Sequence, residues 1–148
     1  MKIIFAILFI LLEISQAHEY KAVFDCSSSD QKYITSRMIL IEKTMNMIEA
    51  DGDKTKFAVT IHGGCLPMVT KNYKKIVSDE DIKYISKSKE VITRLSQKRG
   101  VEVVACAIAL KAHLIHQDNV LPFIRITKNS FMDTIKYQNL GYALMPLE

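Results

Sequence analysis

Short unbroken apolar runs alternate along the chain with longer stretches in which apolar residues recur at helical spacing. The runs are rich in β-branched residues and end in turn-forming ones, a pattern typical of buried strands. They predict five strands, at residues 20–26, 57–61, 101–105, 121–127 and 142–145.

Helices are expected in the stretches that separate these runs. Apolar side chains three and four positions apart lie on one face of a helix, and a glycine just beyond such a stretch favours a helix end. Ser78 and Asp81 resemble a capping box at the start of a helix that ends at Gly100. The other expected helices cover residues 30–50, 106–113 and 129–139, with a short helix or loop at 68–75.

Strands and helices that alternate in this way favour right-handed crossovers between parallel neighbours. We therefore predict an α/β protein in three layers, α/β/α, with a mostly parallel five-stranded sheet. In such sheets ligands and reactive groups gather at the carboxyl ends of the strands, because the connecting loops and helix N-termini converge there.

The N-terminus has the pattern of a secretory signal peptide. Lys2 precedes an apolar run at residues 3–12, and the small residues Ser15 and Ala17 favour cleavage before His18. The run is too short for a membrane anchor, which needs about 20 apolar residues. We expect residues 1–17 to be removed and residues 18–148 to form one domain, exported to the periplasm and without a membrane anchor.

The charge of the chain argues against a nucleic-acid partner. The sequence has 20 Lys and Arg against 16 Asp and Glu, and removal of Lys2 and Glu13 leaves the net charge at +4. This excess is small and spread along the chain, whereas nucleic-acid-binding domains gather basic residues on one face. We expect no nucleic-acid partner.

Three cysteines are the main chemical candidates. Cys26, Cys65 and Cys106 each lie at or just beyond the end of a predicted strand, hence at the reactive edge of the sheet. Their number is odd, so at least one thiol stays unpaired even where disulfides form. Cys106 stands where a strand passes into a helix, and a helix N-terminus lowers the pKa of a thiol and so makes it more reactive. The alternative is that all three are small buried hydrophobic residues.

Histidine spacing offers only part of a metal site. His62 and Cys65 have the His-x-x-Cys spacing of half a zinc site, and His113 and His116 lie one helical turn apart. His113 would lie about 10 Å along the helix from Cys106, too far for one ion to bind both. We therefore expect no metal and interpret His62 as a hydrogen-bonded residue at a strand end.

No cofactor or hydrolase site is expected either. Residues 26–30, Cys-Ser-Ser-Ser-Asp, resemble the phosphate-binding loop of flavodoxin-type proteins but contain no glycine. A helix N-cap at Ser29 or Asp30 explains the same residues without a ligand. The sequence has no Gly-x-Ser-x-Gly nucleophile elbow.

Four motifs in register resemble the DsrE/DsrF-like family of sulfur-relay proteins. Segments 57–67, 100–106 and 139–146 carry most of the likeness. Members of the family have a strand that ends in His-Gly, a Gly-Val-Glu strand that ends in the relay cysteine, a Leu-Pro strand and a closing Gly-Tyr-Ala strand. In this chain the motifs are His62-Gly63, Cys106, Leu121-Pro122 and Gly141-Tyr142-Ala143.

The resemblance implies a flavodoxin-like fold, a homo-oligomer that is commonly a trimer or hexamer, and persulfide transfer between sulfur-donor and sulfur-acceptor proteins. It makes Cys106 the sulfur acceptor, with Cys65 as a secondary thiol and His62 as an auxiliary residue. The expected function is that of an exported, sulfurtransferase-like sulfur carrier with the persulfide on Cys106. The alternative is a non-catalytic homo-oligomeric binding module of the same fold, whose cysteines are structural.

The signal-peptide interpretation predicts that the native mature protein begins at His18 and lies outside the cytoplasm, because signal peptidase cleaves after small residues such as Ala17. N-terminal sequencing of protein isolated from its natural source tests this. Recovery of Met1 or Lys2 as the first residue would contradict it.

Overall fold

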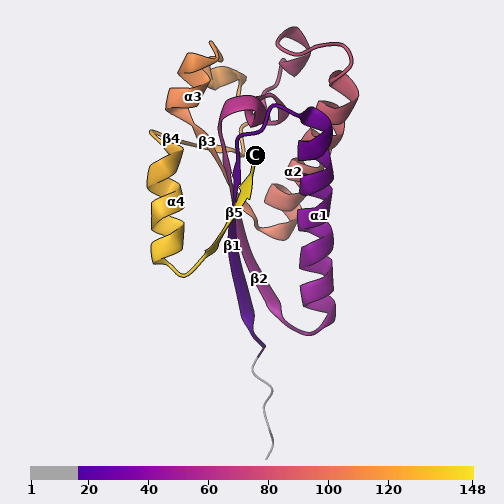
Figure 1. Ribbon diagram of the computed structural model, residues 1–148, viewed down its shortest axis with the longest axis vertical. Coiled ribbons are helices and arrows are strands. Elements are labelled where there is room, and N and C mark those ends of the chain that lie inside the picture. The colour runs from indigo at the N-terminus through magenta and orange to yellow at the C-terminus, as the bar shows by residue number, and fades with distance from the viewer. Residues whose placement is uncertain (1–16) are drawn as a thin grey trace, which may run out of the picture.

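The computed structural model describes residues 17–148, which form a five-stranded sheet with helices on both faces (Figure 1). The expected signal peptide therefore lies outside the described residues, except for Ala17. No helix within residues 17–148 is long and apolar enough to cross a membrane. The strands are β1 (Glu19–Cys26), β2 (Lys54–Ile61), β3 (Glu102–Cys106), β4 (Arg125–Thr127) and β5 (Ala143–Leu147). The helices are α1 (Gln31–Ala50), α2 (Ile82–Arg99), α3 (Ala107–Ala112) and α4 (Ser130–Asn139), with short 3-10 turns η1 (Gly63–Val69), η2 (Tyr73–Lys75) and η3 (Gln117–Asn119).

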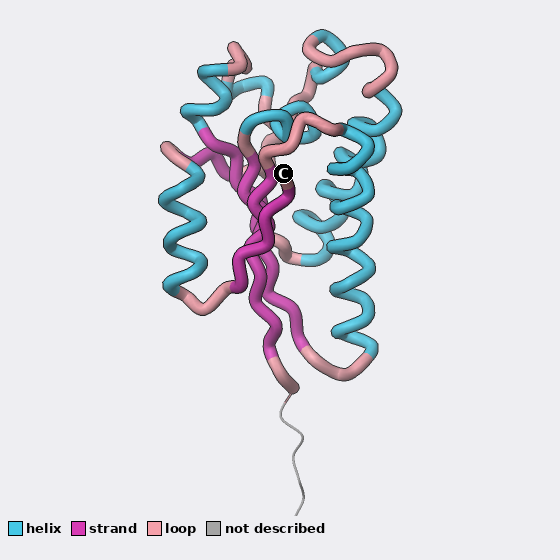
Figure 2. Tube along the Cα trace, viewed as in Figure 1, coloured by secondary structure: helices cyan, strands magenta, loops and turns pink. Residues whose placement is uncertain are grey.

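The strands lie in the order β4-β3-β2-β1-β5, and every neighbouring pair is parallel. From β1 to β4 the chain moves step by step in one direction across the sheet, and from β4 to β5 it returns past all the other strands. Because crossovers are right-handed, a reversal of direction places the connecting helix on the opposite face. Accordingly α1 and α2 lie on one side of the sheet and α4 on the other (Figures 1 and 2). The predicted α/β/α architecture is confirmed.

Side chains of the central strands alternate between two cores of unequal size. On the α1 and α2 face, Phe24 and Cys26 belong to a large apolar cluster that also includes buried residues of both helices. On the α4 face the cluster of buried apolar residues is small. It consists of Val23, Ala58, Tyr137 and Tyr142. Odd-numbered residues of β1 therefore face α4 and even-numbered ones face α1, as the pleat of a strand requires.

Capping residues fix where the two helices that flank the reactive edge begin. Asp30 is the N-cap of α1, and its side chain accepts a hydrogen bond of 2.8 Å from the backbone N–H of Tyr33. Asn129 is the N-cap of α4 and accepts one of 3.0 Å from the N–H of Phe131. These bonds satisfy donors that would otherwise be unpaired at a helix start. The N-cap interpretation of the loop after the first strand is confirmed.

Two elements begin later than the sequence predicted. The fourth strand was expected at residues 121–127, but β4 has only the last three of these. Pro122 has no N–H to donate to a neighbouring strand, and the N–H of Leu121 bonds instead to the carbonyl of Val69 at 2.9 Å.

The prediction that a capping box at Ser78 begins α2 is also wrong. The Ser78 hydroxyl donates to the Asp81 carboxylate at 2.8 Å, and α2 begins after Asp81, which makes no capping bond with its side chain.

A disulfide between Cys26 and Cys65 joins the end of β1 to η1, with the two Cα atoms 5.9 Å apart. The sequence left this pairing open. The loops that carry the two residues are in close contact, since a side chain at Gly64 would collide with the backbone of Ser28 and Ser29. Glycine at this position lets the two chain segments come within reach of the disulfide.

Loss of this disulfide should destabilise the fold. It links residues 39 positions apart, and the chain-entropy model gives about 4 kcal/mol for a loop of this size. In urea denaturation, the Cys26→Ala/Cys65→Ala variant should lose about 2–4 kcal/mol of unfolding free energy. A reductant should lower the stability of the wild type to a similar value and leave the double variant unchanged. Equal unfolding free energies for the oxidised wild type and the variant would contradict the prediction.

Candidate functional site

Cys106 ends β3 and is the N-cap of α3. It pairs in register with Thr127 of β4. On the other side of β3 lies β2, where Ile61 pairs with Ala105. The residue after Ile61 is His62, which therefore lies beside Cys106. Paired residues of parallel strands point to the same face. The structure thus brings Cys106 and His62 together at the carboxyl edge, on the face covered by α4.

Cys106 is the free cysteine of the three, and its side chain is buried, with 4% of the residue exposed. Burial raises the pKa of its thiol, but hydrogen bonds from the backbone N–H groups of Ser130 and Ala109 act in the opposite direction and outweigh it. The Ser130 N–H lies 3.4 Å from Sγ. The net result is a pKa below that of an ordinary cysteine. Helix N-terminal N–H groups stabilise a thiolate in this way.

A polar network ties α4 to the sheet and so places Ser130 against the sulfur. Arg125 of β4 donates 2.7 Å hydrogen bonds to Glu102 of β3 and to Asp133 of α4. The Tyr137 hydroxyl of α4 donates to the second carboxylate oxygen of Glu102 at 2.5 Å. Together these bonds connect α4 with two neighbouring strands, one of which carries Cys106.

His62 is held by a carboxylate from the neighbouring strand. Its Nε2 lies 3.1 Å from Oδ1 of Asp25, and the same oxygen accepts a 2.6 Å hydrogen bond from the Thr60 hydroxyl. Burial raises the pKa of Asp25, but the bonds from His62 and Thr60 outweigh it and hold that pKa below its usual value. The ring of Phe131, the second residue of α4, stands edge-on to the imidazole, with 6.2 Å between ring centroids. The interpretation of His62 as a hydrogen-bonded strand-end residue agrees with this geometry.

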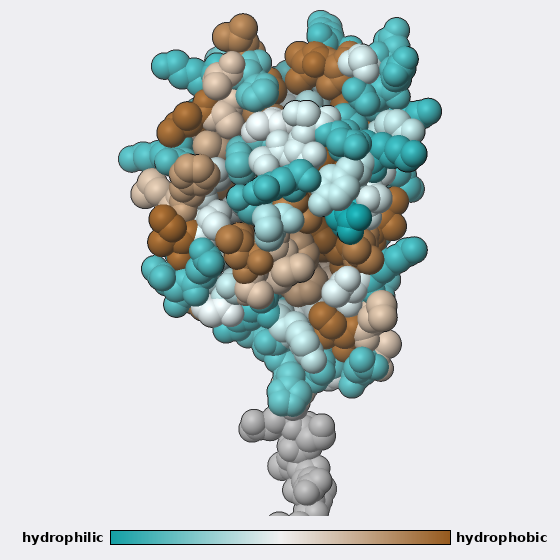
Figure 3. Space-filling view, in the orientation of Figure 1, coloured by the Kyte–Doolittle hydropathy of each residue, from teal (hydrophilic) through white to brown (hydrophobic). Residues whose placement is uncertain are grey.

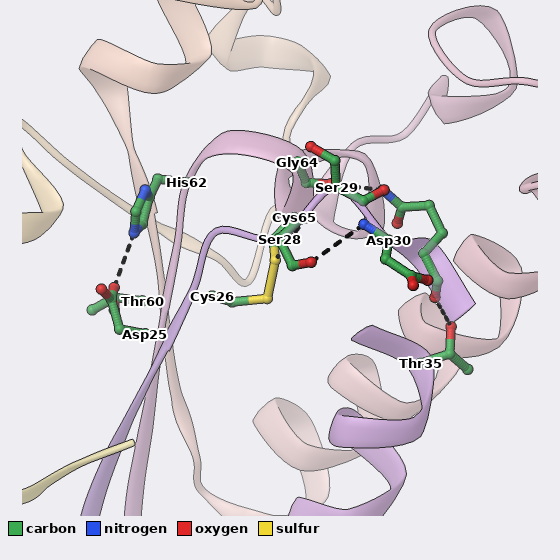
Figure 4. The surroundings of a disulfide bond; sticks show 11 residues. Asp25, Cys26, Ser28, Ser29, Asp30, Thr35, Thr60, His62, Gly64 and Cys65 are labelled. Atoms are coloured by element: carbon green, nitrogen blue, oxygen red, sulfur yellow. Dashed lines mark hydrogen bonds and ion pairs between the residues drawn. A yellow bond between two sulfur atoms is a disulfide. The ribbon is translucent and has the colours of Figure 1, made fainter. Parts of the chain in front are cut away.

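Cys65 lies apart from this cluster. Its sulfur is bonded to Cys26, and Cys26 points to the α1 face because it lies one residue beyond Asp25. In Figure 4 the disulfide and the Asp25–His62 pair stand on opposite sides of the strands. Cys65 is therefore not a free thiol in this structure, and the sheet separates it from Cys106.

The sequence matches the DsrE/DsrF-like family over residues 21–147. The chain belongs to the DsrE/DsrF-like family. An uncharacterized protein of Aquifex aeolicus (strain VF5) is 35% identical over 130 residues, which cover 88% of this chain and 57% of that protein. The chain thus spans little more than half the length of this curated relative. A solved structure, the protein of unknown function MTH1491 from Methanobacterium thermoautotrophicum, has a similar fold with a TM-score of 0.62 at 18% identity, over 86% of this chain and 98% of that one.

The other histidines of this DsrE/DsrF-like chain lie away from the Cys106 cluster. His113 lines a cavity of about 300 Å³ with residues of η1 and the α2 start. His116 interacts with Asp118, 3.3 Å from Nδ1 to the carboxylate. Within residues 17–148, no three His, Cys, Asp or Glu side chains are grouped to hold a metal ion.

The sequence analysis missed three residues of the site, Asp25, Thr60 and Ser130. Asp25 and Thr60 were visible as polar residues inside apolar runs, and strand alternation places both on the face of His62. Ser130 could not be found in this way, because its contribution is a backbone N–H whose position depends on how α4 packs.

Replacement of Ser130 by proline should raise the pKa of Cys106. Ser130 is the first residue of α4, a position where proline is well tolerated, so the change removes the N–H donor and keeps the helix. The rate of alkylation by iodoacetamide should then reach its half-maximum at a higher pH than in the wild type, because the thiolate forms later. Ser130→Ala keeps the N–H and should shift this pH less. An unchanged pH–rate profile for Ser130→Pro would show that the N–H does not stabilise the thiolate.

Proposed function

We propose that this protein carries sulfane sulfur as a persulfide on Cys106. The observation that carries the proposal is the position of the free thiol: it lies at the N-termini of α3 and α4, and its pKa is lowered by their N–H groups. Membership of the DsrE/DsrF-like family, in which sulfur relay is a known role, supports the same chemistry.

Sulfur loading needs only one exchange step. The Cys106 thiolate attacks the outer sulfur of a donor persulfide, R–S–SH, and the bond between the two donor sulfurs breaks as a new S–S bond forms. The products are Cys106–S–SH and the donor thiolate R–S⁻, so no external oxidant or reductant is needed. The reverse exchange with an acceptor thiolate unloads the carrier.

His62 is proposed as the auxiliary residue of this step. With Nε2 bound to Asp25, the ring orientation is fixed and Nδ1 is left for other partners. A neutral ring would accept a hydrogen bond at Nδ1 from an incoming persulfide, and a charged ring would donate one to the departing thiolate. Cys65 is not needed as a secondary thiol in this scheme.

The proposed export is supported by the disulfide. Disulfides form and persist in oxidising compartments such as the periplasm and are rare in the cytosol. The Cys26–Cys65 bond fits such a compartment, where sulfur donors and acceptors would be exported proteins or small polysulfides.

We also propose that the chain forms a homo-oligomer through α4. Three large apolar residues on this helix are each about three-fifths exposed, at 62% for Phe131, 61% for Met132 and 59% for Ile135. Their spacing places them together on one face of the helix, and Phe131 borders His62. Association through this face would cover the apolar side chains and enclose the Cys106 cluster.

Polysulfide treatment tests the carrier function. Mass spectrometry of the protein should show a gain of one sulfur atom, about 32 Da, in the wild type and in Cys26→Ala/Cys65→Ala. Cys106→Ala should gain none, because the two remaining cysteines are joined in the disulfide. A gain that persists in Cys106→Ala would place the acceptor elsewhere. No gain in any of the three proteins would contradict the proposal and favour the non-catalytic binding module.

Sedimentation tests the oligomer. The wild type should sediment at micromolar concentration as a closed symmetric assembly, commonly a trimer or hexamer in this family, and Ile135→Glu should dissociate it because it places charge in an apolar interface. Met47 of α1, which is 70% exposed on the other side of the sheet, provides the matched control Met47→Glu. A monomeric wild type, or equal assembly of both variants, would contradict the proposed interface.

A further inference from the structure

A groove of about 390 Å³ runs between α1 and the edge strand β5. It lies on the α1 face of the sheet, opposite the face that carries Cys106. It exists because α1 covers the middle of the sheet and no helix within residues 17–148 covers β5 on this face. Figure 3 looks onto the β5 edge, where apolar side chains gather between the sheet and α1.

The walls of the groove are mostly apolar. The residues from β1, α1 and β5 that form its apolar surface include Tyr20, Phe24, Tyr33, Leu40, Ile41 and Met145. Three of them are about half exposed, at 50% for Tyr20, 48% for Leu40 and 46% for Met145. Concave apolar surfaces of this volume with a few polar groups are typical of small-molecule sites.

The charged groups that line the groove are all cationic. Arg37 and Lys21 line it, and no acidic residue does. Lys21 pairs with Glu19 at 3.3 Å. The Arg37 guanidinium stacks on the Tyr33 ring, 4.8 Å from its centroid, and has no carboxylate partner within residues 17–148. Its buried Nε has no hydrogen-bond partner there either.

We propose that this groove binds the anion of an unbranched, medium-chain fatty acid. The carboxylate pairs with the Arg37 guanidinium, a geometry that favours two parallel hydrogen bonds. The alkyl chain lies along α1 toward Ile48, which also lines the groove. At 1.5 Å per residue, Ile48 is about 16 Å along the helix from Arg37, enough for a chain of the length of decanoate.

A second copy of the chain that packs groove against groove fits less well. A two-fold interface pairs the same surface of both copies. The lining would then bring Arg37 and Lys21 of one copy toward those of the other, with no carboxylate in the lining to offset the repulsion. An anion with an apolar tail satisfies both the free guanidinium and the apolar walls.

Calorimetric titration of the purified protein with decanoate below its micelle concentration tests the proposal. Saturable binding of one decanoate per chain is expected. Arg37→Gln should weaken it about tenfold, because a charge-assisted pair is lost. Lys43→Gln is the matched control: it removes one positive charge from an exposed position of α1 outside the groove and should leave the affinity unchanged. Decanol, which has no anionic group, should bind the wild type with the affinity that decanoate has for Arg37→Gln.

A second variant guards against a structural effect of the Arg37 change. Leu40→Asp places a carboxylate in the groove at a half-exposed position and should abolish decanoate binding without loss of circular dichroism. The proposal is overturned if wild type, with its fold intact, binds no decanoate, if decanol binds as tightly as decanoate, or if Arg37→Gln and Lys43→Gln bind equally. It is also overturned if Leu40→Asp dissociates an oligomer, since the groove would then be an interface between copies.

Discussion

The parallel pairing of β1 with β2 decides which side chains at the ends of these two strands face α4 and which face α1. Asp25 pairs with Thr60 and Cys26 pairs with Ile61, and successive side chains of a strand point in opposite directions. Asp25 and Thr60 thereby face α4 and fix His62, whereas Cys26 faces α1 and meets Cys65. A slip of one residue in this register would exchange the two faces. It would bury a carboxylate in the large apolar core and break the disulfide.

The separation of Cys26 and Cys65 from Cys106 by the sheet keeps Cys106 a free thiol. In the oxidising compartment that we propose, three cysteines at one edge of a sheet could form mixed disulfides. Here Cys26 and Cys65 are bonded to each other within the larger core, both with none of their surface exposed. The sheet stands between them and Cys106, so thiol–disulfide exchange with Cys106 lacks the direct access to sulfur that it requires.

Most of the fold could be predicted from the sequence, because apolar periodicity reports burial directly. The strands around Val23, Val59 and Val104 and the long helix after Asp30 were all found in this way. The fourth strand was overextended because Leu121, Phe123 and Ile124 pack against the large core, partly or fully buried, without joining the ladder. At the site, Cys106 was singled out because a predicted helix follows its strand end directly and because it stands at the relay position of the family that the sequence resembles. The roles of Ser130 and Asp25 were missed because they depend on which element packs over a strand end, and apolar patterns in one sequence do not contain that information.

Helix α4 both activates Cys106 and covers it, and the strength of its attachment decides how the sulfur is reached. The helix packs on the small cluster of Val23, Ala58, Tyr137 and Tyr142, whereas α1 and α2 share the large core. The Arg125 side chain, which joins Asp133 of α4 to Glu102 of β3, is 43% exposed. Ion pairs of exposed side chains contribute little to stability. Elements with few buried apolar contacts open at lower free energy than the rest of a fold. A movement of α4 away from the sheet would expose Cys106 and remove the Ser130 N–H from it in the same step. Such a movement would remove both the burial that raises the pKa of the Cys106 thiol and a hydrogen bond that lowers it, and it would give a donor protein access to the sulfur.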